Sequence, residues 1–284
     1  MTSKGVTATA IDYQDLTTMA RIATLLDHPA DAVKYTREAQ SIKTAFNAHF
    51  FHPETNEYDT GSQTANAMPL VVGLVPAGRH DAVLNNLVAD IRRHNNHVTA
   101  GDIGFHYVVR VLTDNGRSDV LFDMLSRTDK PSYGDQLAHG ATTLTEAWDA
   151  NPDDSQDHFM LGHAEEWFYR GLAGIDFDRT RAADERILIH PAIVGNVQRA
   201  AATFYSSVGE IQSRWSRTGN TLRMNVTIPS GTTATIQFPT SYRKSIAVNG
   251  HALAADHAIR NLHLTGASPS CVVAAGTYRF LLQQ

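Results

Sequence analysis

The densest run of acidic, histidine and tryptophan side chains lies between Tyr133 and Arg170. Its acidic residues and histidines are Asp135, His139, Glu146, Asp149, Asp153, Asp154, Asp157, His158, His163, Glu165 and Glu166. Trp148 and Trp167 lie in the same run. Carboxylates interleaved with aromatic rings suit a sugar site, because the apolar face of a sugar stacks on a ring and a pair of carboxyl groups cleaves a glycosidic bond.

Most of these acids also fit ordinary structural positions. Residues 151–154, with the sequence NPDD, are typical of a turn ahead of a helix. Glu165 and Glu166 are typical of a first helical turn, where carboxylates favour the helix dipole. Glu146 differs, since it stands between Leu144 and Trp148 in a stretch too apolar for an ordinary solvated loop. A carboxylate buried there needs hydrogen bonds or a function, because burying it unpaired is costly.

Other motifs give weaker signals. His94 and His97 are three residues apart, but no further ligand falls at a helpful spacing, so a solvated helix end is the favoured interpretation. Residues 101–104 lack the preceding strand and the third glycine of a phosphate-binding loop. The segment HAEEW has no second histidine at the zincin spacing, and Cys271 fits a small core residue in a strand. The sequence thus predicts no metal site and no cofactor.

Composition narrows the class of protein. Of 284 residues, 42% are hydrophobic and 19% charged, which is enough apolar material for roughly two packed domains. The formal net charge of -5 argues against a nucleic-acid partner. No run of 18 apolar residues is present, so no membrane association is expected. The first residues, MTSKGVTATA, do not resemble a signal peptide, which leaves a cytoplasmic and an exported location both open.

Hydrophobic spacing predicts helices in the first part of the chain and strands in the second. Apolar residues three and four apart predict helices over residues 16–26, 30–50, 61–75, 79–94, 103–112, 120–125 and 160–175. Alternating residues predict strands over 187–190, 200–206, 211–216, 222–228, 234–238, 246–248, 263–264 and 277–282. Residues 229–231, with the sequence PSG, are expected to turn the chain between two strands of a hairpin. We therefore expect a helical domain over residues 1–177 and an antiparallel β-sandwich over residues 178–284.

Several of these segments together resemble a known family. The segments GATTLTEAWD and DHFMLGHAEEWFYRGLAGID closely resemble catalytic motifs of bacterial α-L-rhamnosidases, glycoside hydrolase family 78. TGSQTANAMPLVVGLVP, DKPSYGDQLAHGATT and NVTIPSGTTATIQFP are also similar to that family, and the resemblance covers nearly the whole chain. It implies part of an (α/α)6 barrel followed by a C-terminal β-sandwich, and a rhamnose-containing glycoside or polysaccharide as substrate.

The resemblance also implies roles for individual residues. Members of the family hydrolyse terminal α-L-rhamnosyl groups with inversion, so that one carboxyl group protonates the leaving oxygen and another activates water. Glu146, in a glutamate-before-tryptophan motif, is the expected general base. His158 is expected to contact rhamnose hydroxyls, and Trp148 fits the pocket wall and a core aromatic position equally well.

The sequence departs from the family pattern in three places. Thr145 stands where many members have Trp, and Asp157 where many have Asn, which points to a shifted substrate preference. The Gly-Asp-Trp-type segment with the general acid is expected just before KGVTATAID and is not present. We therefore expect an N-terminally truncated barrel with one exposed apolar flank, completed by the missing portion or by another copy. Within the chain, Asp12, Asp15 and Asp102 are acid candidates by position only.

Three functions stay open at this point. The first is an α-L-rhamnosidase that needs a further portion for activity. The second is a non-catalytic rhamnoside-binding remnant. The third is a different enzyme with an (α/α) barrel, such as an unsaturated uronyl hydrolase.

Overall fold

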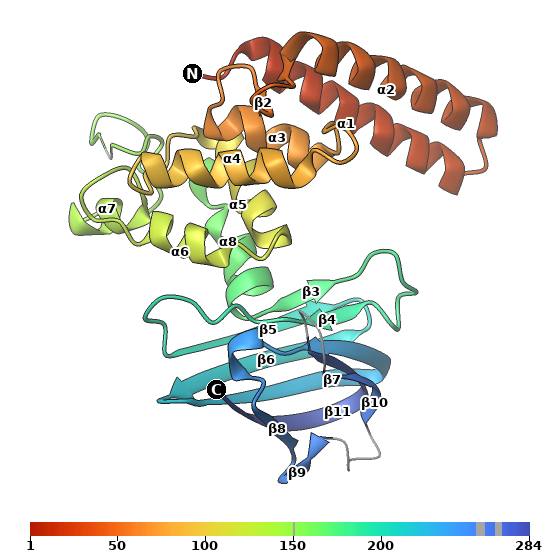
Figure 1. Ribbon diagram of the computed structural model, residues 1–284, viewed down its shortest axis with the longest axis vertical. Helices are drawn as coiled ribbons and strands as arrows, with labels where there is room; N and C mark the ends of the chain where they lie inside the picture. Colours follow the sequence, from red (N-terminus) through yellow and green to blue (C-terminus); the bar gives the residue numbers. More distant parts are fainter. Residues whose placement is uncertain (150, 254–258, 265–268) are drawn as a thin grey trace. The chain divides into compact units, whose positions relative to one another are not determined.

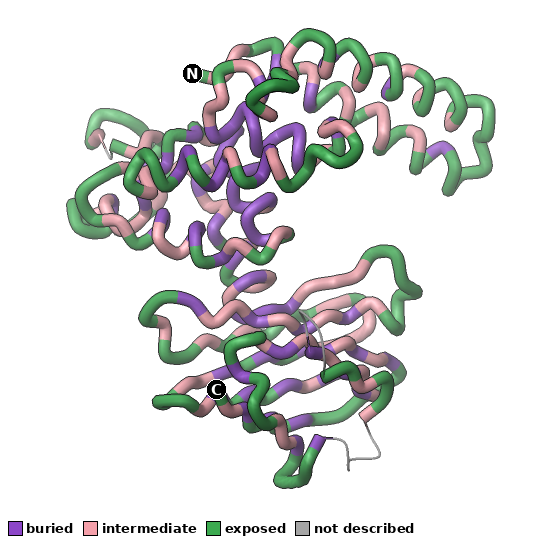
Figure 2. Tube along the Cα trace, viewed as in Figure 1, coloured by how far each residue is buried: buried purple, intermediate pink, exposed green. Residues whose placement is uncertain are grey.

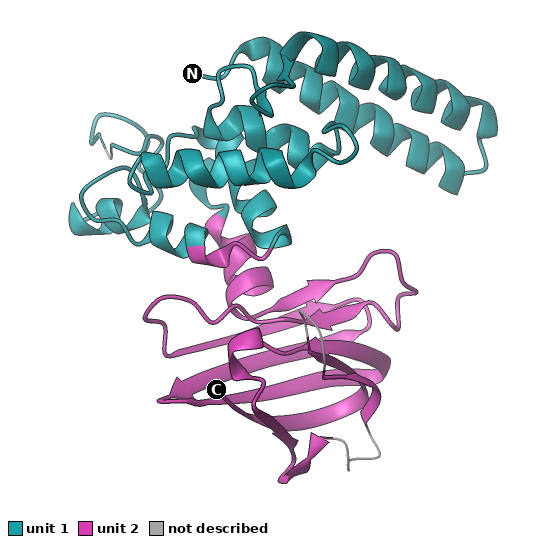
Figure 3. Ribbon diagram, in the orientation of Figure 1, with its two compact units in different colours: residues 1–115, 120–163 teal, residues 116–119, 164–284 magenta. Residues whose placement is uncertain are grey.

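A computed structural model describes residues 1–149, 151–253, 259–264 and 269–284. The chain divides into two compact units, one of residues 1–115 and 120–163 and one of residues 116–119 and 164–284 (Figure 3). Unit 1 is helical and unit 2 is mostly strands, as the change of hydrophobic spacing predicts. The domain boundary between residues 177 and 178 stays a prediction. Within the described residues, no helix combines the length and the apolar character required to cross a membrane.

Unit 1 is a series of helices joined by short connections (Figure 1). They are α1 (Lys4–Leu25), α2 (Pro29–Phe50), α3 (Gln63–Val72), α4 (His80–Arg93), α5 (Asp102–Asp114), most of α6 (Ser118–Leu125), α7 (Tyr133–Ala138) and the 3₁₀ turn η1 (Phe159–Leu161). A short hairpin of β1 (Phe51–His52) and β2 (Glu57–Tyr58) connects α2 to α3. The helices predicted over residues 30–50, 79–94, 103–112 and 120–125 are confirmed.

Serine caps fix where three of the helices begin. The hydroxyl oxygens of Ser3, Ser62 and Ser132 accept hydrogen bonds from backbone N–H groups three residues later, at the starts of α1, α3 and α7. The first helix therefore begins at Lys4, well before the predicted residue 16. The prediction missed this start because it followed the apolar stripe and not the cap.

The core of unit 1 lies around α3 and α5 (Figure 2). α3 is buried on almost all sides, including its polar residues Gln63, Thr64 and Asn66. Gly104 of α5 lies directly against Thr64, so that the two helices approach closely. α1 and α2 are mostly exposed, and α1 carries Met19 and Ile22 on its surface.

The helix expected over residues 160–175 is confirmed only in its central part, because it is interrupted after residue 161 and ends at residue 172. The segment consists of η1, a glycine turn, α8 (Ala164–Trp167), a π-helical turn η2 (Phe168–Leu172), and the first residue of strand β3. Gly171 leaves room for the Trp167 indole, and Gly174 has a φ of 80° that ends the helix. Ile175 then pairs with Ile189 in the sheet.

Unit 2 is built on one large sheet. Its strands are β3 (Ile175–Phe177), β4 (Ile187–Ile189), β5 (Arg199–Ser206), β6 (Gly209–Thr218), β7 (Thr221–Gln237), β8 (Ser245–Val248), β9 (His251–Ala252), β10 (Ile259–His263) and β11 (Ser270–Gln283), with a 3₁₀ turn η3 (Thr240–Tyr242) before β8. The main path runs β3-β4-β7-β11-β8-β9, with β5 and β6 joined to β7, and β10 joined to β11. The pairs within this sheet are antiparallel except β4 with β7, which is parallel.

The hairpin predicted around residues 229–231 is wrong. Residues 221–237 form one long strand, β7, and both halves pair with the same partner, β11. Ile228 pairs with Gly276 and Thr233 with Ala274, so the extra residues between them bulge out of the ladder and do not reverse the chain. Gly231, with a φ of 77°, supplies the backbone conformation that this bulge requires.

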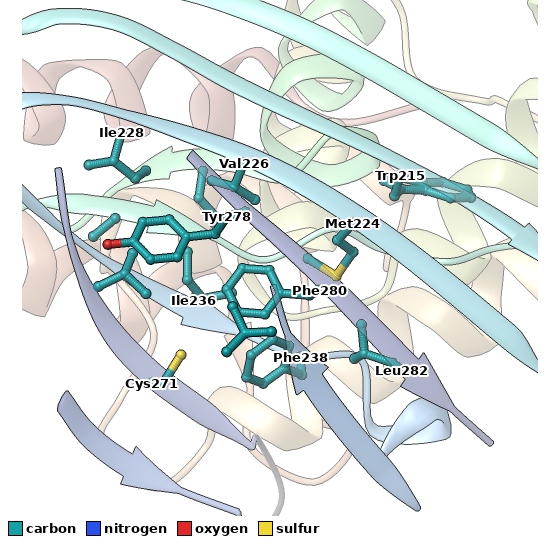
Figure 4. Packing of buried hydrophobic residues seen from close by; sticks show 14 of the residues in the cluster. Trp215, Met224, Val226, Ile228, Ile236, Phe238, Cys271, Tyr278, Phe280 and Leu282 are labelled. Atoms are coloured by element: carbon teal, nitrogen blue, oxygen red, sulfur yellow. The ribbon is translucent and has the colours of Figure 1, made fainter. Parts of the chain in front are cut away.

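The buried faces of these strands form the core of unit 2 (Figure 4). Alternate residues of β6, β7 and β11 point into it, among them Trp215, Met224 and Phe280. The Trp215 Nε1 donates to the Leu172 carbonyl oxygen at 2.8 Å, which ties the π-helical turn to β6. Cys271 is buried in β11 as predicted, and burial raises the pKa of its thiol to about 12, which leaves it unreactive.

Candidate functional site

The three predicted site residues Glu146, Trp148 and His158 all lie in unit 1, in the loop between α7 and η1. Backbone hydrogen bonds join the two arms of this loop. The Glu146 N–H donates to the Ser155 carbonyl oxygen at 2.9 Å, and the His158 N–H donates to the Leu144 carbonyl oxygen at 2.9 Å. These bonds bring Glu146 and His158, far apart in the loop sequence, onto facing arms. We refer to residues 143–158 as the site loop.

The tip of the site loop is a turn, as the sequence NPDD predicts. The Asp154 N–H donates to the Asn151 carbonyl oxygen at 3.2 Å, and the Asp153 N–H donates to the Asn151 side-chain oxygen at 3.1 Å. The side chains of Asp153 and Asp154 lie in solvent. Asp153 and Asp154 are therefore turn residues, as the sequence predicts.

Glu146 is exposed, whereas its neighbour Thr145 is buried. Thr145 accepts a hydrogen bond from the Gln136 side-chain amide at 2.6 Å and donates to the Ala147 carbonyl oxygen at 2.7 Å. The apolar setting inferred from the sequence therefore belongs to position 145, and Glu146 faces solvent. One carboxylate oxygen of Glu146, Oε2, accepts a hydrogen bond from the Ser155 N–H at 3.2 Å.

Trp148 is fixed on the start of α5. Its Nε1 donates to the Ala100 carbonyl oxygen at 2.8 Å. Its ring meets the rings of Phe105 and Tyr133 edge-on, with centroids 4.9 and 5.3 Å apart. The side chain is half-buried, so it serves both as a packing residue and as part of the surface beside the loop.

His158 is half-buried and lies next to an exposed aromatic ring. Its imidazole is nearly parallel to the Phe159 ring, with centroids 6.5 Å apart. The Phe159 side chain is 80% exposed, which is unusual for a phenylalanine and leaves an apolar surface open beside His158.

The helix starts around the site loop lie at one end of unit 1. The Thr2 and Ser62 hydroxyls are 2.6 Å apart, which joins the starts of α1 and α3. Gln63, at the start of α3, donates to the His97 carbonyl oxygen at 2.8 Å and accepts from the Thr99 N–H at 3.0 Å. The next residue, Ala100, holds Trp148. The starts of α1, α3 and α5 therefore share this end of unit 1, and their positive ends favour negatively charged groups there.

The three candidate acids lie in different places. Asp102 is in the first turn of α5, two residues from the Ala100 carbonyl that holds Trp148, and its Oδ1 accepts from the Ile103 N–H at 2.8 Å. Asp12 and Asp15 are exposed residues farther along α1. The Tyr107 hydroxyl on α5 donates to the Gln14 side-chain oxygen on α1 at 3.2 Å, so this part of α1 lies beside the middle of α5 and not its start.

Sequence reasoning missed the aromatic and amide residues that hold the site loop. Phe105 and Tyr133 pack against Trp148, Gln136 holds Thr145, and Gln63 holds the segment before α5. The sequence signal for Gln63 is that three polar residues, Gln63, Thr64 and Asn66, open a helix that is otherwise apolar. Among the described residues, no group of three or more His, Cys, Asp or Glu side chains has the arrangement of a metal site.

Comparison with family models identifies both parts of the chain. The model of the bacterial alpha-L-rhamnosidase six-hairpin glycosidase domain matches residues 1–172. The model of the bacterial alpha-L-rhamnosidase C-terminal domain matches residues 174–252.

Relatives and solved structures agree with these models. An alpha-L-rhamnosidase of Streptomyces avermitilis is 31% identical over 98% of this chain, and the match covers 27% of that protein. The crystal structure of Streptomyces avermitilis alpha-L-rhamnosidase complexed with L-rhamnose superposes with a TM-score of 0.87 and 28% identity, over 99% of this chain and 27% of that one. The alpha-L-rhamnosidase from Dictyoglumus thermophilum superposes with a TM-score of 0.83 and 28% identity, over 96% of this chain and 31% of that one.

The chain thus spans about a quarter of the length of the curated relatives that it matches. The first family model covers the helical part of the chain, and the second begins at residue 174 and covers most of the sheet part. They confirm the expected portion of an (α/α)6 barrel followed by a β-sandwich domain. The chain belongs to the bacterial α-L-rhamnosidases, a family of glycoside hydrolases.

Proposed function

We propose that the chain is the base-bearing part of an α-L-rhamnosidase that hydrolyses terminal α-L-rhamnosyl groups with inversion. One observation supports this most strongly. The site loop joins Glu146 and His158 on facing arms through two backbone hydrogen bonds, beside the anchored ring of Trp148. A carboxylate, an imidazole and an aromatic ring at one place are the groups that binding and hydrolysing a sugar require.

In this proposal, Glu146 acts as the general base. Its exposed position gives water access to the carboxylate, and the Ser155 N–H holds one oxygen, Oε2, in place. The other oxygen has no hydrogen-bond partner among the described residues and is the one that takes a proton from the attacking water. The water then attacks the anomeric carbon on the face opposite the leaving group, which inverts the configuration.

His158 and Trp148 bind the sugar in the same proposal. The imidazole of His158 bonds rhamnose hydroxyls, and the adjacent Phe159 ring gives the methyl-bearing face of rhamnose an apolar surface. Trp148 bounds the site on the α5 side. Its indole N–H donates to the Ala100 carbonyl oxygen, so its ring, and not its N–H, faces the sugar in this proposal.

The inverting reaction also needs a carboxylic acid that protonates the leaving oxygen, roughly 6.5–9.5 Å from the base. Asp12 and Asp15 are on α1, away from its start, and Asp102 is bonded to its own helix start. We therefore propose that the acid belongs to the part of the relatives that this chain does not span.

Hydrolysis of 4-nitrophenyl α-L-rhamnoside tests this proposal. The chain is assayed alone and in a chimera. In the chimera it replaces the segment of the Streptomyces avermitilis relative to which 98% of the chain aligns. We expect the chimera to release nitrophenol and the chain alone to bind L-rhamnose in calorimetry with little or no hydrolysis.

The alternative, a rhamnoside-binding remnant without catalytic function, predicts a different pattern. The chain then binds L-rhamnose, and a folded chimera releases no nitrophenol. A chain that shows no saturable heat with L-rhamnose, together with an inactive folded chimera, contradicts both functions.

A further inference from the structure

The outward face of the unit 2 sheet carries a ladder of arginine and amide side chains. Strands β5, β6, β7 and β11 lie side by side there (Figure 1). Arg214 of β6 pairs with Asn225 of β7, which pairs with Arg279 of β11. Two residues away on the same face, Ser216 pairs with Arg223 of β7, and Arg199 of β5 pairs with Ser216. The alternate residues of these strands point into the core, so all four arginines lie on the opposite, solvent side.

The arginines of this ladder have no acidic partners. Among the described residues, Arg199, Arg214, Arg223 and Arg279 form no ion pair, whereas Arg117, Arg170 and Arg181 of unit 2 each pair with Asp or Glu. On the outward rows of these four strands the one carboxylate is Glu210, at the hairpin end of β6, where it accepts a hydrogen bond from Gln212. A chain with a net charge of -5 therefore gathers uncompensated positive charge on one sheet face.

The same face is hollowed. A groove of about 390 Å³ lies on it, and its lining includes Thr203, Gln212, Arg214, Asn225, Thr227 and Arg279. Neighbouring strands are about 5 Å apart, so Arg214 and Arg279 lie on strands about 10 Å apart, with the Asn225 amide between them. Hydroxyl and amide groups from Thr203, Gln212 and Thr227 line the next row along the groove.

We propose that this groove binds an acidic polysaccharide, with Arg214 and Arg279 bonding its carboxylate or sulfate groups and the amide and hydroxyl side chains bonding its sugar hydroxyls. The planar guanidinium group matches a carboxylate or a sulfate with two parallel hydrogen bonds. Asn, Gln and Thr both donate and accept, which sugar hydroxyls require. The groove lies entirely in unit 2, and the proposal does not depend on the role of Glu146.

The groups in the groove favour a glycan over a nucleic acid. Proteins that bind single-stranded nucleic acid place several aromatic rings in succession along a basic groove, because each base stacks on a ring. Here the groove residues include no aromatic ring, and the exposed Tyr205 beyond Thr203 is the single aromatic on the outward rows of these four strands. One ring at the end of a polar groove fits the stacking of one sugar residue.

Calorimetric titration of the full chain with polygalacturonate tests this proposal. Dextran sulfate is the second anionic probe, neutral dextran is the uncharged control, and a single-stranded DNA oligonucleotide is the competing polyanion. We expect saturable binding of polygalacturonate, dextran sulfate or both, and none of neutral dextran. The anionic probe that binds with the higher affinity shows whether the groove prefers carboxylate or sulfate groups. Raising NaCl from about 50 mM to about 500 mM is expected to weaken binding, because salt screens exposed charges.

Substitution of the ladder gives the matched comparison. The double variant R214Q/R279Q is expected to bind the anionic probe at least about tenfold more weakly, since hydrogen bonds to charged groups are lost. Arg260→Gln, at an exposed arginine of β10 outside the groove, is expected to bind as the unchanged chain does.

Several results overturn the proposal. They are equal binding of neutral dextran and the anionic probes, no binding of either anionic probe, tighter binding of DNA than of both, and an equal loss in Arg260→Gln and in the double variant. If circular dichroism shows that the double variant is unfolded, the probe comparison and the salt dependence of the unchanged chain decide the question.

Discussion

At the scale of single residues, the carboxylates of the chain differ in what holds them. Asp153 and Asp154 point into solvent from a turn, whereas Glu146 is held by the Ser155 N–H on the opposite arm of the site loop. Asp176 is the other extreme. Its two oxygens accept hydrogen bonds from Arg170 at 3.0 and 2.9 Å, and His190 lies 3.4 Å away. A carboxylate with one backbone partner stays free to react, and one held by both an arginine and a histidine side chain serves stability.

Asp176 is predicted to stabilise unit 2 in a pH-dependent way. Burial raises the pKa of its carboxyl group, but hydrogen bonds from His190 and Arg170 outweigh burial, so the pKa lies well below its ordinary range. A lowered folded-state pKa contributes stability above the unfolded-state pKa of about 4, and this contribution is lost as the pH falls below that value. Asp176→Asn is expected to lower the free energy of unfolding at pH 7 by about 2 kcal/mol, because it breaks a partly buried ion pair.

Urea unfolding at neutral and acidic pH measures this effect. The difference between Asp176→Asn and the unchanged chain is expected to shrink as the pH is lowered from about 7 to about 3. Asp178→Asn is the control, because its carboxylate is more exposed than that of Asp176 and is held by Thr180 and Arg181 at the surface. A loss in Asp176→Asn that is the same at both pH values contradicts the assignment.

At the scale of elements, the contact between α3 and α5 positions the site loop. Gln63 on α3 holds the segment that leads into α5, and the start of α5 holds Trp148. Gly104 lets the two helices meet, since a Cβ at this position has its closest contacts with the Thr64 side chain.

Gly104→Ala is therefore expected to be destabilising even though alanine favours helices. An added methyl group must push α3 and α5 apart, which costs about 1–3 kcal/mol in a well-packed core. Thermal or urea unfolding measures the loss. Combining Gly104→Ala with Thr64→Ala is expected to recover part of it, because two of the three crowding atoms are removed. Losses that simply add in the double variant contradict the contact.

The elements also show what hydrophobic spacing predicts and where it stops. α4 was predictable because Val83, Leu87 and Ile91 repeat on one face, and all three are buried. The break of the segment over residues 160–175 was not, because it depends on glycines that make room for neighbouring side chains. The bulge in β7 reads as a turn in the sequence, since a proline followed shortly by a glycine is typical of both. Only the pairing of both halves with β11 distinguishes the two.

At the scale of the whole molecule, the candidate site could be located from the sequence but not described. The residues Glu146, Trp148 and His158 follow from family motifs, and the structure places them in one loop. Their environment did not follow, because neighbouring residues of this loop differ in burial, and Thr145, not Glu146, is the buried one. The residues that hold the loop come from α3, α5 and α7, and only the folded chain brings these helices together.

The central claim is that Glu146 is the general base of an α-L-rhamnosidase site to which this chain contributes. The most direct measurement is the rate of 4-nitrophenyl α-L-rhamnoside hydrolysis by the chimera carrying Glu146→Gln, compared with the chimera carrying Asp153→Asn in the same loop. The amide of Gln cannot accept the proton of water, so we predict a fall in kcat of about 10² to 10⁴-fold. The Asp153→Asn chimera, changed at an exposed turn residue, is expected to stay within about twofold of the parent. A Glu146→Gln chimera that hydrolyses as fast as the Asp153→Asn chimera contradicts the claim.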